Sequence, residues 1–65
     1  MLKVVFQHTV KNTTLLITDN PIPFVDYKAI SIDSKLYEPL DVYDLDNALA
    51  IVGTGDFVGK EIKLV

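Results

Sequence analysis

The amino-acid sequence predicts a mainly β fold: a small single-domain barrel or sandwich of about five to six short strands. Three observations lead to this prediction. Polar and apolar residues largely alternate at the start of the chain, short apolar runs rich in β-branched residues follow, and turn-forming residues recur about every eight to twelve positions. A chain of 65 residues has room for one domain, so residues 1–65 are expected to form a single small β-rich unit.

An opening hairpin is the most clearly indicated element. Apolar residues recur at nearly every second position from residue 2 to residue 10, and two is the side-chain period of a strand. Lys11-Asn12 fits a two-residue turn, and Thr13–Thr18 is a returning strand rich in β-branched residues. The alternation assigns one face, expected to be the buried one, to Leu2, Val4, Phe6, His8 and Val10.

The middle of the chain contains a strand-breaking segment and a second hairpin. Two prolines within residues 19–23 remove backbone donors and interrupt any hydrogen-bond ladder. Ala29–Ile32 and Leu36–Leu40 then form two predicted strands around a turn at residues 33–35. Pro39 is expected to place the second of these strands at a sheet edge or to end it.

Residues 41–50 allow two interpretations. Apolar residues recur there at spacings of three and four, which fits one face of a helix and would give an α+β fold with a helix at about 41–50. Asp46-Asn47 is good turn chemistry, however, and residues 49–52 form a short apolar run typical of a buried strand. We favour strand, turn and strand over the helix.

All three glycines lie in one segment, Gly53–Lys60, which at first sight suggests a phosphate-binding loop. Its glycine spacing fits neither the dinucleotide-binding pattern nor the P-loop pattern, and an aspartate places negative charge at its centre. The last residues alternate like a strand, where a phosphate site would need a helix. The segment is therefore predicted to be a turn and bulge, with the last strand starting near Phe57. A bulge at Gly59 would bring Phe57 to the same face as Ile62 and Leu64.

Composition excludes several classes of function. The chain has no cysteine and one histidine, which excludes disulfides and thiolate metal sites and argues against a zinc site. The net charge is −3, and the six basic residues are scattered lysines; without arginine, nucleic-acid binding is not expected. No apolar run has the length of a membrane span or a secretory signal, so we expect no membrane partner and a cytoplasmic location. Lysine without arginine, together with abundant Ile, Asn and Asp, loosely matches an AT-rich bacterial or phage genome.

Candidate groups for chemistry are sparse, and we expect neither an enzyme nor a cofactor. His8 could act as a general base or metal ligand, but its place on the predicted buried face favours a structural role. A catalytic constellation with it would need Ser31 or Ser34, and both lie in or beside a predicted turn. The densest group of oxygen ligands is a weak candidate for a divalent-ion site and comprises Asp41, Asp44, Asp46 and Asn47.

Consecutive apolar residues give the strongest functional indication. Residues 4–6, 15–17 and 49–52 are apolar at adjacent positions, and adjacent residues of a strand face opposite sides of its sheet. One small sheet cannot bury both sides, so either the sheet closes or a partner covers the second side. We therefore expect a non-enzymatic interaction module that self-associates as a homo-oligomer or docks on a protein partner. The candidate interaction surface consists of Val5, Leu16, Tyr27, Tyr37, Tyr43 and Phe57.

Two alternatives stay open at this point. The first is a small-molecule or divalent-ion binding domain that uses Asp41, Asp44 and Asp46, and addition of calcium or magnesium would perturb those residues selectively. The second is an acidic inhibitor of a nucleic-acid-binding protein, which would require the carboxylates to gather on one face.

Overall fold

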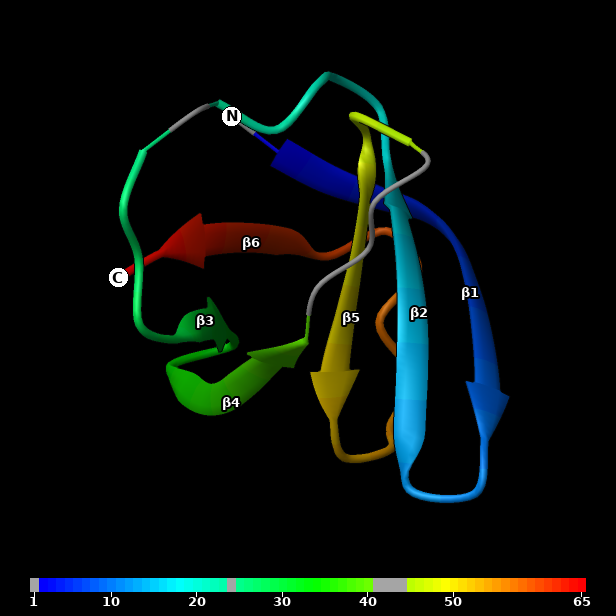
Figure 1. The fold of residues 1–65 in the computed structure, drawn as a ribbon. Helices are drawn as coiled ribbons and strands as arrows, with labels where there is room; N and C mark the ends of the chain where they lie inside the picture. Colours follow the sequence, from blue (N-terminus) through cyan, green and yellow to red (C-terminus); the bar gives the residue numbers. More distant parts are fainter. Residues whose placement is uncertain (1, 24, 41–44) are drawn as a thin grey trace.

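The structure is a computed structural model that describes residues 2–23, 25–40 and 45–65. Within these ranges the chain forms a closed barrel of six antiparallel strands and contains no helix (Figure 1). The strands are β1 (Leu2–Val10), β2 (Thr13–Thr18), β3 (Ile30–Ile32), β4 (Lys35–Leu40), β5 (Ala48–Val52) and β6 (Glu61–Leu64). Their order around the barrel is β1-β2-β5-β4-β3-β6, and pairing of β6 with β1 closes it. The predicted small, mainly β fold is confirmed.

The barrel has two halves, one formed by β1, β2, β5 and β4 and the other by β1, β6, β3 and β4. The strands β1 and β4 therefore contribute to both. Leu2 and Lys3 of β1 pair with β6, whereas the rest of the strand pairs with β2. The first half of β4 pairs with β3 and the second half, from Glu38, with β5. Pro39 lies inside β4, so of its two expected effects the end of the strand is wrong, whereas a local edge position is found. Pairing with β3 stops at Tyr37, so Pro39 has a neighbouring strand, β5, on one side only. A proline is tolerated at such a position because its missing backbone N–H is not needed by a second strand.

A one-residue bulge in β1 reverses the direction of every side chain after it. Val4 lies opposite Thr18 and Phe6 opposite Ile17, so Val5 is an extra residue in the ladder. Val4 is buried in the barrel, but Phe6 is 57% exposed and His8 is exposed as well. The prediction of a single buried face from Leu2 to Val10 is therefore wrong beyond Val4, because one inserted residue shifts a period of two by one position.

A tight turn joins the two strands of each hairpin and contains residues with positive φ, which few residues other than glycine adopt. Lys11 has a φ of 56° in the two-residue turn between β1 and β2, where the sequence predicts it. Asp33 and Ser34 have φ values of 52° and 64° and form the turn between β3 and β4. Two successive positive φ angles match the right-handed twist of the flanking strands. The predicted second hairpin is confirmed, with a turn of two residues in place of three.

The turn at Asp46-Asn47 leads directly into β5, as favoured from the sequence. The Thr18 amide donates to the Asn47 carbonyl at 2.8 Å, and the Asn47 side-chain amide donates to the Thr18 carbonyl at 3.2 Å. These bonds attach the turn to the end of β2. The alternative of a helix at 41–50 is wrong for residues 45–50, and residues 41–44 lie outside the described ranges.

Inward-facing aliphatic residues from all but one strand fill the barrel. The buried core consists of Leu2, Val4, Leu16, Ile30, Ile32, Leu49, Ile51, Phe57 and Ile62. From β4, Tyr37 packs against this core, and its ring meets that of Phe57 edge to face at 5.3 Å between centroids. The two buried threonines also have hydrogen-bond partners, since Thr14 Oγ1 donates to the Gly53 carbonyl at 2.7 Å and Thr18 Oγ1 to the Asn20 carbonyl at 2.6 Å.

Truncation of Leu16 should separate core packing from surface effects. Leu16 is fully buried, so Leu16→Ala should lower the free energy of unfolding by about 2–5 kcal/mol. Its neighbour Leu15 faces outward and is half-buried, so Leu15→Ala should cost clearly less. Chemical denaturation followed by circular dichroism measures both variants. Equal stability of the two would contradict the assignment of inner and outer sides.

Candidate functional site

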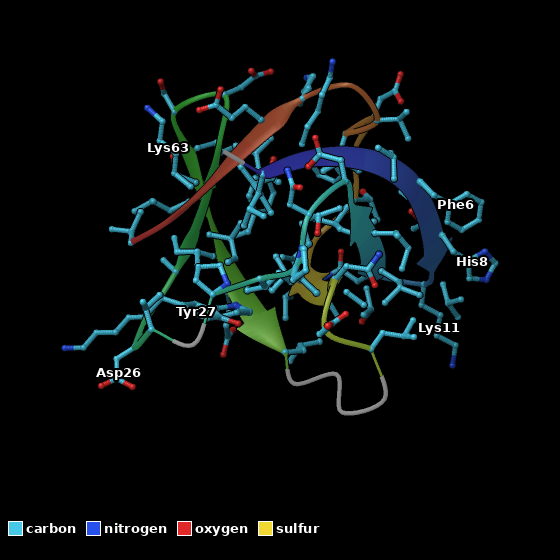
Figure 2. The ribbon with its side chains drawn as sticks, turned by 90° about the horizontal axis from the view of Figure 1, so that it is seen from above. Phe6, His8, Lys11, Asp26, Tyr27 and Lys63 are labelled. Carbon is cyan, nitrogen blue, oxygen red and sulfur yellow. The ribbon has the colours of Figure 1, made fainter. Side chains whose placement is uncertain are left out.

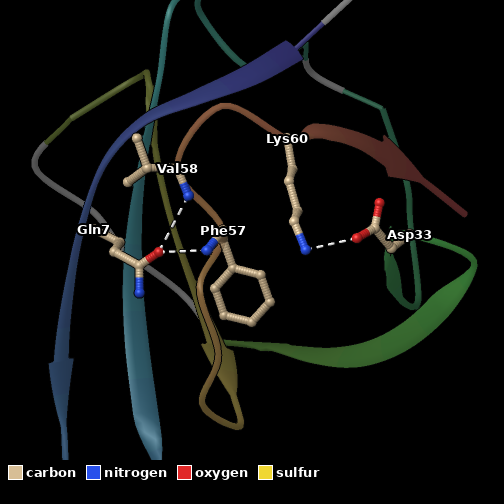
Figure 3. A network of polar contacts seen from close by, with 5 residues as sticks. All are labelled: Gln7, Asp33, Phe57, Val58 and Lys60. Carbon is tan, nitrogen blue, oxygen red and sulfur yellow. Dashed lines mark hydrogen bonds and ion pairs between the residues drawn. The ribbon is translucent and has the colours of Figure 1, made fainter.

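Gln7 holds the glycine-rich loop against the barrel (Figure 3). The bulge at Val5 turns this side chain away from the outer surface. Its Oε1 accepts hydrogen bonds from the backbone amides of Phe57 at 2.5 Å and Val58 at 3.2 Å, and its Nε2 donates to the Gly55 carbonyl at 2.7 Å. One side chain therefore satisfies three backbone groups in a segment that has no strand partner. No residue pattern signals this role, because it depends on the reversed direction of Gln7.

The next two amides of the loop are also engaged within the chain. Gly59 N–H donates to the Val4 carbonyl at 2.8 Å, and Lys60 N–H donates to the Phe57 carbonyl at 3.0 Å. Four successive amides, from Phe57 to Lys60, thus already have acceptors and are not presented to an anion. The segment consequently has the architecture of a structural turn.

The last strand begins later than predicted. β6 starts at Glu61 rather than near Phe57, and Gly59 lies in a tight turn with a φ of +88° rather than in a strand bulge. Phe57 is nevertheless buried beside Ile62 in the core, so their predicted common direction is confirmed. The turn at Gly59 produces the reorientation that a bulge was expected to give.

An ion pair connects the end of the loop to the turn between β3 and β4. Lys60 Nζ lies 2.6 Å from Asp33 Oδ2 (Figure 3). The hydrogen bond to Asp33 and the negative charge of its carboxylate raise the pKa of Lys60 above its ordinary value. The raised pKa means that the protonated lysine favours the folded state at neutral pH, and this contribution is lost as alkaline pH removes the lysine proton. Both side chains are well exposed, so solvent screening keeps the contribution small.

The outer side of the sheet formed by β1, β2, β5 and β4 is unusually apolar. Residues directly opposite each other in antiparallel strands share a side of the sheet. Leu16 and Leu49 are opposite and buried, which identifies the inner side. We call the outward positions the outer apolar face, and they form three rows: Phe6, Ile17 and Ala48; His8, Leu15, Ala50 and Leu40; and Val10, Thr13, Val52 and Glu38.

Exposure within the outer apolar face is greatest on β1. Phe6 is 57% and Val10 55% exposed, and Leu40 on the opposite margin is 38% exposed. Leu15 and Ile17 are half-buried between these margins. Figure 2 shows Phe6 and His8 pointing away from the barrel. The face therefore presents large apolar side chains to solvent from several strands, and its one charged member, Glu38, lies in the third row.

The structure divides the predicted interaction residues into three groups. Val5 is half exposed at the bulge, and its role in an interaction stays a prediction. Leu16 and Phe57 are 0% and 3% exposed, so their assignment to a contact surface is wrong; both point into the closed barrel. Tyr27 and Tyr37 are half-buried and pack against the core. Tyr43 lies outside the described residues.

The candidate groups for chemistry do not assemble into a common site among the described residues. His8 pairs with Leu15 on the outer apolar face, whereas Ser31 pairs with Lys63 in the other half of the barrel; Figure 2 shows His8 and Lys63 on opposite sides of the molecule. Ser31 and Ser34 line a shallow open depression with Asp33, Glu61 and Lys63.

The divalent-ion prediction stays a prediction, because Asp41 and Asp44 lie outside the described ranges. Asp46 is exposed at the turn before β5. Among the residues that the structure describes, no three histidine or carboxylate side chains lie close enough to hold a metal ion.

Comparisons with known proteins add no assignment. Searches against protein-family models, curated proteins and solved structures found no match. The described part of the chain contains no helix that is long and apolar enough to cross a membrane. The function must therefore be inferred from the surface of this barrel.

Replacement of Gln7 should loosen the glycine-rich loop. Gln7→Ala leaves the Phe57 and Val58 amides and the Gly55 carbonyl without their partner, so the free energy of unfolding should fall by about 1–3 kcal/mol. Hydrogen exchange at the two amides should become faster. Gln7→Glu separates the two kinds of contact, because its carboxylate still accepts from both amides, whose exchange should stay slower than in Gln7→Ala, but cannot donate to the Gly55 carbonyl. Unchanged exchange in Gln7→Ala would contradict the role of this side chain.

Proposed function

We propose that this chain is a non-enzymatic interaction module that self-associates or docks on a protein partner through the outer apolar face. The observation that supports this proposal is the exposure of Phe6, Val10 and Leu40 on that face, on either side of the buried Ala48 and Ala50 of β5. Each large apolar side chain removed from water contributes about 1.5–3 kcal/mol. Burial of Phe6 and Val10 against a partner would therefore supply a substantial part of an association free energy.

The distribution of charge supports an apolar partner surface. The chain carries a net charge of −3, yet two of the three rows of the outer apolar face contain no aspartate, glutamate or lysine. Charged residues are depleted at the cores of protein interfaces, and aromatic residues such as Phe6 are enriched there. Apart from Glu38 in the third row, the acidic side chains among the described residues lie outside the face: after β2, in turns and loops, and on β6.

The shape of the outer apolar face also favours contact with a protein over binding of a small molecule. Binding pockets for small molecules are concave and enclose most of their ligand. The outer apolar face is the convex side of a barrel sheet, which suits contact with another protein surface.

Ile17→Lys tests the proposal. Ile17 lies in the first row of the face, so a lysine there places charge in the proposed contact and should weaken association at least tenfold. Val25→Lys is the matched control, because Val25 is 52% exposed but lies outside the face. Sedimentation velocity and ¹⁵N–¹H spectra over a concentration series measure association, and shifts should gather at face amides such as Leu15 and Ala50.

The result that would contradict the proposal is specific. It is a wild-type chain whose face amides respond neither to its own concentration up to the millimolar range nor to a protein recovered from its natural source. A response of Ser31 and Lys63 in place of the face would contradict it equally, because those residues lie in the other half of the barrel.

A further inference from the structure

The second half of β1 has a strand neighbour on one side only. β1 pairs with β6 through Leu2 and Lys3, and Val4 adds hydrogen bonds to Gly59 and Lys60. From Phe6 to Val10 the strand pairs with β2 alone. No other strand pairing or backbone hydrogen bond of Phe6–Val10 is found among the described residues, and Figure 1 shows this part of β1 along the border of the molecule. The barrel therefore has a local open edge.

The register identifies which backbone groups this edge presents. Val10 and Thr13 flank a two-residue turn, and the pair that closes such a turn is hydrogen-bonded. Hydrogen-bonded and non-hydrogen-bonded pairs alternate along antiparallel strands. Phe6 and His8 consequently direct their backbone groups toward β2, whereas Gln7 and Thr9 direct theirs toward the open edge. Two N–H and two C=O groups are thus available for pairing.

The composition of the edge leaves it unprotected. Proteins usually block exposed edges with charged residues, prolines or bulges. Here Lys3 and Lys11 and the bulge at Val5 lie at the two ends of the segment. The five residues between these ends, Phe6–Val10, contain no proline, aspartate, glutamate, lysine or arginine. A strand can approach this segment without meeting a charge.

We propose that a second copy of this chain pairs with the open edge, β1 antiparallel to β1, with His8 on the twofold axis. The proposal deepens the proposed function and rests on it, because it names a partner that pairs beside the outer apolar face and extends it. The register follows from the free backbone groups. Only when Gln7 lies opposite Thr9 of the second copy do both edge-facing residues form hydrogen-bonded pairs, and each such pair exchanges two bonds.

Side chains agree with this register. Phe6 lies opposite Val10 of the second copy on the outer side, and Lys11 lies opposite Val5 rather than opposite another lysine. Such apolar cross-strand pairs stabilise antiparallel sheets. The same residues meet from both copies, so one segment supplies both halves of the contact, as a twofold interface requires.

The dimer also enlarges the outer apolar face. Four strands spaced about 4.8 Å apart and about five residues long give a face of about 300 Å² in projection. Stable interfaces bury about 800 Å² per partner, so a single face is small for this purpose. Pairing of the β1 strands joins two copies of the four-stranded half into one continuous sheet and doubles the face.

A charge placed at position 8 provides a specific readout. Residues at a non-hydrogen-bonded pair approach closely, so the two His8 side chains face each other at the axis. Like charges directly opposite destabilise a strand pair, so a permanent positive charge at this position should separate the two copies. No titratable side chain faces His8 from β2, where Leu15 lies opposite; the charged groups on neighbouring segments are Lys11 at the turn and Asp56 in the loop held by Gln7.

The experiment compares variants of the edge with variants of the face by sedimentation velocity at pH 7.5. Thr9→Pro removes an edge-facing N–H and should weaken self-association at least tenfold, whereas Thr9→Val keeps that N–H and should associate like wild type. His8→Lys, which alters an exposed side chain only, should abolish association, whereas the uncharged variant His8→Gln should associate like wild type.

The outcomes separate this proposal from the proposed function. Wild-type association in Thr9→Pro or His8→Lys, together with loss of association in Ile17→Lys, would overturn the β1 contact and leave docking through the outer apolar face in place. A monomeric wild-type chain that still binds another protein through Ile17 would do the same. Loss of association in Thr9→Pro and His8→Lys, with Thr9→Val unaffected and each variant retaining the wild-type pattern of core resonances, would support the β1 dimer.

Discussion

The bulge at Val5 is the constraint on which the rest of this structure depends. Before it, β1 directs Leu2 and Val4 into the barrel and pairs with β6; after it, the same strand pairs with β2 and directs Phe6, His8 and Val10 to solvent. The reversal also turns Gln7 toward the loop that precedes β6, where it satisfies three backbone groups. One inserted residue thus bends the strand around the barrel, anchors the loop and exposes an apolar face.

Closure of the sheet into a barrel buries the apolar residues on its inner side, but not those on its outer side. Leu16 and Leu49 find an interior in the barrel, and Tyr37 and Phe57 complete it. The residues that alternate with them, Leu15 and Ile17 among them, have no interior to enter in a chain of this size. The apolar surplus therefore appears on the outside of one sheet, which connects the size of the domain to its proposed role in association.

Local signals predicted the elements well, and nonlocal geometry explains the errors. The hairpins around Lys11-Asn12 and Asp33-Ser34 follow from turn residues and alternation, so their existence could be read from the sequence. No residue pattern marks Val5 as a bulge, because its cause is the path of the strand between two neighbours. The positions of Phe6, His8 and Gln7 consequently could not be predicted. Leu16 is wrongly assigned to the contact surface, because apolar residues at adjacent strand positions indicate two apolar faces but do not show which face is inside.

The closing pair of the barrel has a further consequence for how the chain folds. Leu2 pairs with Ile62, so two residues from nearly opposite ends of the sequence must meet before the interior is sealed. The hairpins can form early from near neighbours, but this last pairing carries a large loop-closure entropy and should slow folding. During synthesis on a ribosome, Phe57 and Ile62 would emerge late, so a nascent chain would hold its half-built core open until β6 is free. In that interval the cell would encounter an unclosed sheet, which is the form most prone to aggregation.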